Sequence, residues 1–275
     1  MNIWIAMAGV LTSVAAASAL LWHWRARNRM YARLVAGQAD VADLERVELD
    51  VGRPREARSL ASAFAATRLI RIDQFVGPAT LARLRDEALS GIPHMDHSFI
   101  PLHKKGNTLS YEQILRRAPH LVAFYYSRSL RQWVSIVTGT TVRTTPLRDQ
   151  SSLSVLCYRD SGDHINWHYD HNFYRGRHFT VLLALVNRSA SGAPSQSRLE
   201  WQLPDGTAQT VDMPENTLVV FEGSRVRHRV TPTGPGDLRV ILSMTYCDDP
   251  HTGYFKELVR RVKDTAFFGI RAIWD

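Results

Sequence analysis

The hydrophobic pattern divides the chain into an apolar N-terminal run, a middle part with helical periodicity and a C-terminal part with short apolar runs. In the middle part, RLIRIDQFV from Arg68 predicts a short strand, and Gly77-Pro78 precedes a helix with Leu81, Leu84, Ala88 and Leu89 on one face. A polar stretch then continues to Asn107 and is expected to be a loop. A second helix is predicted over 119–137, because proline suits a first helical turn and Gly139 follows the last apolar position.

From Ser151 the pattern changes to short β-rich runs separated by turn residues. Strands this short, with turn signals every 8 to 12 residues or so, are typical of an all-β sandwich or jelly roll. We expect the helical part to pack against one of its sheets. The eight predicted strands are SSLSVLCY, INWHYDHNFY, FTVLLALVN, RLEWQLP, TAQTVDM, TLVVFEG, RVRHRVTP and LRVILSMTY.

The predicted fold class is therefore mainly β, with a jelly-roll core, supporting α-helices and one N-terminal transmembrane helix. The expected organisation is a signal anchor over 1–24, a basic juxtamembrane segment and helical or loose connector over 25–67, a helical support region over 68–150, the jelly-roll core over 151–249 and a C-terminal helix over 250–275.

The anchor prediction rests on residues 3–22, which carry no charge. A helix of about 20 residues crosses a bilayer, and tryptophans stand at both ends of this one, where headgroups favour amphipathic rings. Four arginines follow it and no basic residue precedes it, which predicts a single-pass topology with the N-terminus outside and the remaining chain in the cytoplasm. A cleaved secretory signal is the alternative, with Ala15, Ala17 and Ala19 as a small-residue cleavage region.

The distribution of charge along the chain bears on whether the protein binds nucleic acid. The formal net charge is +8, from 34 Lys and Arg against 26 Asp and Glu. Four of the arginines lie in the acid-free stretch before residue 34, so the remaining chain carries 30 minus 26, or +4. No basic run interleaved with aromatic residues occurs there, and nucleic acid is not an expected partner.

Cys157 and Cys247 lie in apolar runs and are expected to be buried thiols in a reducing compartment.

A metal site is predicted where two potential ligands share one strand face. His168 and Asp170 are two residues apart in a predicted strand, so their side chains point the same way. His228, in a distant strand, is the best third ligand. Two histidines and one carboxylate form the facial triad of non-haem Fe(II) oxygenases, which leaves open positions for cosubstrate and oxygen. A second pair, His94 and Asp96, has the same spacing but lies in the expected loop.

Other residues of the β region are placed to bind a dicarboxylate beside this metal. Arg239 follows His228 by eleven residues, on the next strand of a hairpin predicted at TGPG, and its planar fork suits a carboxylate. Ser243 lies on the same face of that strand, and Tyr158 on an earlier strand adds a phenol hydroxyl.

These residues resemble those of a known family. The stretch from CYRDSGDHINWHYDH to FTVLLALVN, followed by LVVFEGSRVRHRVTPTGPGDLRVILSMTY, is similar to the catalytic core of the prolyl-4-hydroxylase-like branch of 2-oxoglutarate- and Fe(II)-dependent dioxygenases. The resemblance covers about 69–247. It implies a double-stranded β-helix fold, and the family motif corresponds to Tyr158, Gly162, His168, Asp170, His228 and Arg239.

The resemblance implies that His168, Asp170 and His228 bind Fe(II) and that Arg239 anchors the carboxylate of 2-oxoglutarate. Molecular oxygen would be the second cosubstrate, with ascorbate as an optional accessory reductant. Because Asp170 is retained, hydroxylation or oxidative demethylation of an unidentified protein, lipid or small-molecule substrate is expected rather than halogenation. The sequence departs from the family in two places: FTVLLALVN lacks a tyrosine common in relatives, and SGAPSQSR replaces a Gly-Gly turn.

Several alternatives remain open from the sequence. The alternative from a different functional class is a catalytically silent jelly-roll module that binds a partner or lipid at the membrane. His164, His171 and His178 are expected to lie around the site without ligating, and 172–175 are candidate substrate contacts. The arginines of RVRHRV form either a solvated face or an anion site. The amphipathic C-terminal helix either packs on the core with a solvated basic face or lies on a membrane surface.

Overall fold

The computed structural model describes residues 54–146, 149–203 and 205–268, together with scattered helical positions between 17 and 32. Within this described part, no helix combines the length and apolarity needed to cross a membrane. The predicted anchor lies mostly outside the described residues, so the structure adds no observation on its topology.

Helices and strands alternate through the described chain. The helices are α2 (Pro54–Thr67), α3 (Pro78–Ser90), the 3-10 helix η2 (Ile92–His94), α4 (Tyr111–Arg117), α5 (Pro119–Tyr126), α6 (Arg128–Thr138) and α7 (Tyr254–Phe268). The strands are β1 (Leu69–Ile72), β2 (Asp96–Ile100), β3 (Lys104–Leu109), β4 (Arg143–Thr144), β5 (Leu153–Tyr158), β6 (His164–His168), β7 (His178–Arg188), β8 (Leu199–Gln202), β9 (Ala208–Val211), β10 (Leu218–Phe221), β11 (His228–Val230) and β12 (Leu238–Cys247).

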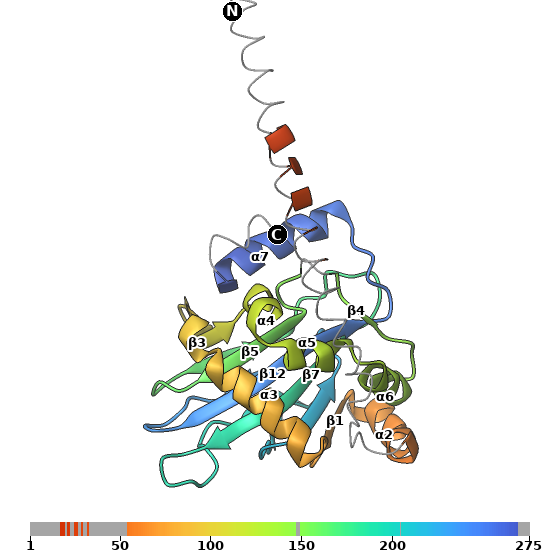
Figure 1. The fold of residues 1–275 in the computed structure, drawn as a ribbon. Helices are drawn as coiled ribbons and strands as arrows, with labels where there is room; N and C mark the ends of the chain where they lie inside the picture. The colour runs from red at the N-terminus through yellow and green to blue at the C-terminus, as the bar shows by residue number, and fades with distance from the viewer. Residues whose placement is uncertain are drawn as a thin grey trace, which may run out of the picture.

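The strands form one antiparallel sheet whose order is β1-β10-β7-β12-β5-β3-β6-β11-β8-β9, with β2 beside β3 and β4 beside β12. Its two halves are wrapped around a shared interior, because side chains of β7, β10 and β12 and of β6, β8 and β11 meet in one buried cluster. Helices α2 to α6 lie on the outer side of the half that contains β7 and β12 (Figure 1). The prediction of a mainly β, jelly-roll-like core with supporting helices is confirmed.

The two-residue period of a strand explains how the core is divided. On β7, Val181, Leu183 and Leu185 pack toward the helices, whereas Leu182 and Ala184 point into the interior between the sheet halves. A strand buried on both faces reads as a continuous apolar run. FTVLLALVN has this composition for that reason.

Two expectations for the middle of the chain are wrong. The single helix predicted over 119–137 is broken at Ser127, whose hydroxyl accepts a hydrogen bond from the Leu130 amide and begins α6. The helix end at Gly139 is as predicted, in the left-handed conformation. The stretch expected to be a loop up to Asn107 contains β2 and most of β3. Because β3 lies between β5 and β6, the regions 68–150 and 151–249 share one sheet.

The predicted hairpin between the strands of His228 and Arg239 is also wrong. β11 pairs with β6 and β8, whereas β12 pairs with β4, β5 and β7. The TGPG segment therefore carries the chain from one half of the sheet to the other. A local turn signal identifies the turn but does not choose the strand partners.

One alternative for the C-terminal helix was packing on the core with its basic face in solvent. In the structure, α7 instead turns basic side chains inward. Arg260 is buried and donates to Glu257, and Lys263 donates to Ser151. Leu258 and Val262, in contrast, are exposed. The aliphatic stems of long basic side chains pack well against a protein surface, and here they form the inward face.

We expect Phe64→Ala to lower the free energy of unfolding by about 3–5 kcal/mol, the usual cost of truncating a buried phenylalanine. Phe64 lies on α2, is almost fully buried and packs against Phe179 of β7 with ring centroids 6.2 Å apart. Denaturant unfolding followed by circular dichroism measures the change. Phe99→Ala removes the same atoms from an exposed position and should change the free energy by no more than about 0.5 kcal/mol. Equal losses in the two variants would contradict the docking of α2.

Candidate metal centre

The two predicted histidine ligands face each other on neighbouring strands. His168 at the end of β6 is the register partner of His228 at the start of β11. The register then shifts, so that Val230 pairs with Ile165. This bulge adds one residue to β6 and turns both Ile165 and His168 toward the cavity between the sheet halves. Asp170 lies two residues beyond the end of β6, not within a regular strand as predicted.

His168, Asp170 and His228 lie close enough to hold one metal ion. One ligand atom from each lies within 4.8 Å of the others, and this is the one such group found among the described residues. Asp170 Oδ1 is 3.6 Å from His168 Nε2 and 3.7 Å from His228 Nε2. The structure therefore brings together the three ligands that the sequence indicated.

Hydrogen bonds orient both imidazole rings. His168 Nδ1 lies 2.8 Å from the Asn166 carbonyl, and His228 Nδ1 lies 3.0 Å from the Val226 carbonyl. A carbonyl only accepts, so each Nδ1 carries the proton and donates it. Each Nε2 is then left with a lone pair directed at the cluster, as metal ligation requires.

Protonation states also suit ligation. Burial lowers the pKa of His228 to about 4, so this ring is neutral at pH 7. Burial would raise the pKa of Asp170, but the neighbouring His228 and His168 outweigh it and hold the pKa well below its ordinary value. Together with the second imidazole, from His168, the cluster offers two histidine nitrogens and one carboxylate, a donor set that suits non-haem iron.

The Asp170 carboxylate is fixed by two neighbours that the sequence did not identify. Thr180 Oγ1 donates to Asp170 Oδ2 at 2.5 Å, and the Asp170 amide donates to the Gly223 carbonyl at 3.0 Å. A Cβ on Gly223 would lie 2.3 Å from Asp170 Oδ2, so only glycine fits there. A threonine at the start of an otherwise aliphatic run was the available signal for the first of these neighbours.

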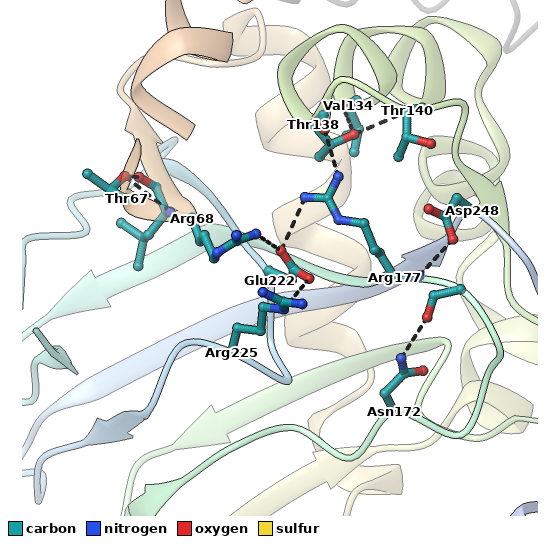
Figure 2. A network of polar contacts seen from close by, with 12 residues as sticks. Thr67, Arg68, Val134, Thr138, Thr140, Asn172, Arg177, Glu222, Arg225 and Asp248 are labelled. Atoms are coloured by element: carbon teal, nitrogen blue, oxygen red, sulfur yellow. Dashed lines mark hydrogen bonds and ion pairs between the residues drawn. The ribbon is translucent and has the colours of Figure 1, made fainter. Parts of the chain in front are cut away.

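The residue before Gly223, Glu222, is a buried carboxylate at the centre of an ion network with partly exposed arginines. Figure 2 shows Glu222 surrounded by Arg68, Arg177 and Arg225, with nitrogen to oxygen distances of 2.7, 3.1 and 3.2 Å. Burial alone would raise the pKa of Glu222, but the hydrogen bonds from Arg177 and Arg68 lower it. The network joins β1, β7 and the turn after β10, and thereby holds Gly223 against Asp170.

Thr180→Val should lower the affinity for a divalent metal by about 10- to 100-fold, the usual effect of removing a hydrogen bond to a metal ligand. The substitution keeps the side-chain shape but leaves Asp170 Oδ2 without its hydroxyl donor. Titration with Fe(II) under anaerobic conditions, or with Co(II), measures the dissociation constant. Thr180→Ser keeps the hydroxyl and is the matched control. An affinity in the valine variant equal to that of the serine variant would contradict this role.

The metal cluster lies in a cavity of about 220 Å³ between the sheet halves. His171, Phe173, Tyr174 and His178 line it, together with Ser243 of β12. Of the candidate substrate contacts at 172–175, Phe173 and Tyr174 are therefore placed at the cavity. Asn172 instead stabilises its own turn, with hydrogen bonds to the Gly176 carbonyl and from the Tyr174 amide.

Tyr158 and Arg239 meet in the barrel interior as register partners on β5 and β12. The Arg239 guanidinium lies 5.6 Å from the centroid of the Tyr158 ring. Tyr158 Oη and Arg239 Nε are both buried and have no hydrogen-bond partner in the structure as described. Tyr158 lines the metal cavity, whereas Arg239 lines an adjoining cavity of about 380 Å³ beside Asn187 and Met213. Buried polar groups are nearly always satisfied, so this pair is suited to a bound carboxylate.

Two lysines in the cavity lining were not indicated by the sequence. Lys104 of β3 is buried and donates to Thr108 at 3.0 Å, and burial lowers its pKa to about 7. Lys263 of α7 lies 5.3 Å above the Phe173 ring. Neither belongs to a recognisable motif, because β3 and α7 reach the cavity only through tertiary packing.

The remaining candidates lie away from the metal cluster. Asp96 is exposed on β2, and its pair with His94 is not part of the metal-ligating group. His164 Nδ1 lies 2.7 Å from the Gly162 carbonyl. Arg227 and Arg229 lie over Trp167, at 5.6 and 4.7 Å from its ring centroid. Arg229 also pairs with Glu200, so RVRHRV is largely neutralised within the protein.

Comparison with solved structures identifies the fold. The α-ketoglutarate-dependent epimerase SnoN from nogalamycin biosynthesis matches with a TM-score of 0.59 at 14% identity, over 74% of this chain and 87% of that one. A prolyl hydroxylase from Trichoplax adhaerens matches with a TM-score of 0.59 at 15% identity, over 71% and 90%. A prolyl-4-hydroxylase from Pseudomonas putida matches with a TM-score of 0.54 at 14% identity, over 70% and 98%.

The fold is the double-stranded β-helix of these oxygenases. No protein-family description matches the chain, and no curated protein matches its sequence. A further structure of SnoN contains Fe3+ and α-ketoglutarate. In the present structure, the donor set of the metal cluster fits an iron ion, and the buried Tyr158 Oη and Arg239 Nε, which lack hydrogen-bond partners, fit a carboxylate of α-ketoglutarate.

Proposed function

We propose that this protein is a 2-oxoglutarate- and Fe(II)-dependent dioxygenase that hydroxylates an unidentified substrate. The observation that carries the proposal is the cluster of His168, Asp170 and His228, whose ligand atoms converge at the wall of a cavity. Hydrogen bonds to protein groups orient all three of these side chains.

The proposed roles follow from position and charge. The three cluster residues hold Fe(II), and Arg239 with Tyr158 binds the far carboxylate of 2-oxoglutarate. Ser243, half-buried on the same interior face of β12, is a further donor for the cosubstrate. Bound iron, with 2-oxoglutarate and oxygen, supplies the oxidising chemistry that converts a C–H bond to C–OH and releases succinate and CO2. Phe173 and Tyr174 shield the cavity from water and orient the substrate.

The proposal includes attachment to a membrane through residues 3–22. Their length, lack of charge and flanking tryptophans support a single-pass anchor. The arginines that follow support a cytoplasmic catalytic domain.

Conversion of 2-oxoglutarate to succinate tests the proposal. Full-length protein with Fe(II), ascorbate and oxygen should release succinate slowly without substrate and faster when membrane lipid extract or a peptide pool supplies one. Preincubation with a chelator should remove the activity, and added Fe(II) should restore it. A protein that binds Fe(II) but forms no succinate with any pool would instead be the catalytically silent binding module.

A further inference from the structure

The exposed large apolar side chains of the folded part lie on chain segments that also contribute residues to the lining of the metal cavity. Apart from the N-terminal positions Leu21 and Trp22, the described members of this class are Phe99, Leu102, Tyr169, Leu258, Val259 and Val262. We call these six residues the apolar rim. Leu102 is 93% exposed, and Leu258 and Val262 are 60% and 62% exposed.

The apolar rim comes from three chain segments that all reach the cavity. Phe99 and Leu102 lie at the β2–β3 connection, where the next residue, His103, lines the cavity. Tyr169 lines the cavity itself. Val262 precedes Lys263, which also lines it, and α7 packs against β2. Exposed apolar residues scattered singly over a surface are ordinary, but a group of them beside a functional cavity marks an interaction site.

We propose that the apolar rim docks on a lipid bilayer, so that the metal cavity opens toward the membrane and receives a lipid substrate. This inference rests on the proposed function and names the substrate class of the same site. It deepens that function without changing its chemistry.

Three observations favour a bilayer over a folded partner. The chain carries the uncharged run 3–22, which would hold the domain at a membrane. The apolar rim consists of separate projecting side chains instead of a groove, which suits insertion of about 5–10 Å into the boundary between headgroups and acyl chains. Figure 1 shows α7 lying across the end of the sheet, at the periphery of the fold.

The cavity lining is suited to a lipid that carries an anionic group. Lys104 from β3 and Lys263 from α7 both line it. Hydroxyl groups of Thr108, Ser151 and Ser154 lie in the same lining. A phosphate or carboxylate would find cationic and hydroxyl donors there, while the apolar rim contacts the chain region of the lipid.

Site-specific labels test the docking independently of catalysis. The two native cysteines are fully buried, so a cysteine introduced at an exposed position can be labelled selectively. Full-length Leu102→Cys and Val262→Cys, each carrying an environment-sensitive fluorophore, are reconstituted into phosphatidylcholine vesicles containing phosphatidylglycerol. Ala193→Cys is the matched control, since Ala193 is exposed in the β7–β8 connection, next to Pro194 of the Arg239 cavity.

We expect the emission of the two rim labels to shift to shorter wavelength and to be quenched by brominated lipids, whereas the Ala193 label does neither. Rim labels as water-exposed as the control, in protein bound to the vesicles, would overturn the proposal. Shielding of the rim labels in detergent without lipid, accompanied by self-association, would overturn it in favour of a protein interface.

A charge variant links the docking to turnover. Leu102→Asp combined with Val262→Asp should lose the stimulation of succinate release by vesicles but retain the slow substrate-independent release. Ala193→Asp should retain both activities. Retained stimulation in the double variant would contradict the lipid substrate. Absence of succinate release from the unmodified protein would instead contradict the proposed function, while the fluorescence result would still stand.

Discussion

Asp170→Ala is expected to abolish measurable succinate release and to lower the affinity for Fe(II) by more than about 100-fold. Loss of a residue that only hydrogen-bonds to a metal ligand already lowers metal affinity by about 10- to 100-fold. Asp170 itself is the single anionic candidate ligand of the cluster. Its removal also leaves the two histidine Nε2 atoms without the carboxylate at 3.6 and 3.7 Å. Metal titration and a coupled succinate assay measure the two effects separately.

The chain contains its own control for this variant. Asp96 has the same spacing from a histidine as Asp170, but it lies exposed on β2 and is not part of the metal-ligating group. Asp96→Ala should therefore leave metal affinity and succinate release unchanged. If both variants lost activity to the same extent, or if Asp170→Ala bound Fe(II) normally, the metal-site assignment would be wrong.

Arg239→Met should raise the apparent KM for 2-oxoglutarate by at least about 30-fold, because loss of one partner of a buried charge pair costs 2 kcal/mol or more. The affinity for Fe(II) should stay the same, since Arg239 lies outside the metal-ligating group. Succinate release measured over a range of 2-oxoglutarate concentrations gives the KM. Arg239→Lys keeps a cation at this position and should be affected less.

The same variant should not lower thermal stability in the absence of 2-oxoglutarate. Arg239 is almost fully buried, and burial lowers its pKa to about 10, so the folded protein bears a desolvation cost for this cation. The Tyr158 ring offsets only part of that cost. A large drop in melting temperature, with no change in the KM for 2-oxoglutarate, would assign Arg239 a structural role instead.

Most of the metal cluster was predictable because its signal is local. His168 and Asp170 are close in sequence, and His228 stands out as a histidine within a short β-rich run. The supporting residues were not predictable in the same way. Thr180 and Gly223 acquire their roles only because the turn after β10 lies against the end of β6.

The positions of the strands could be predicted from the sequence, but their pairing partners could not. Each of the eight predicted strands overlaps an observed one, since alternation and turn residues are properties of short segments. The partner of each strand is not such a property. β11 pairs with β6 and β8 and not with β12, and β3 enters the sheet between β5 and β6.

The sequence by itself determined the mainly β fold class, the three ligand candidates and the uncharged run that suggests an anchor. These depend on residue type and spacing within short windows. Only the tertiary structure decided that Arg239 meets Tyr158 in the interior, that Lys104 lines the metal cavity and that Leu258, Val259 and Val262 of α7 are exposed. The physical reason is that the burial of a side chain and the pairing of a strand depend on which distant segments pack against them in the folded chain. Amphipathic residues such as lysine and arginine can satisfy either environment.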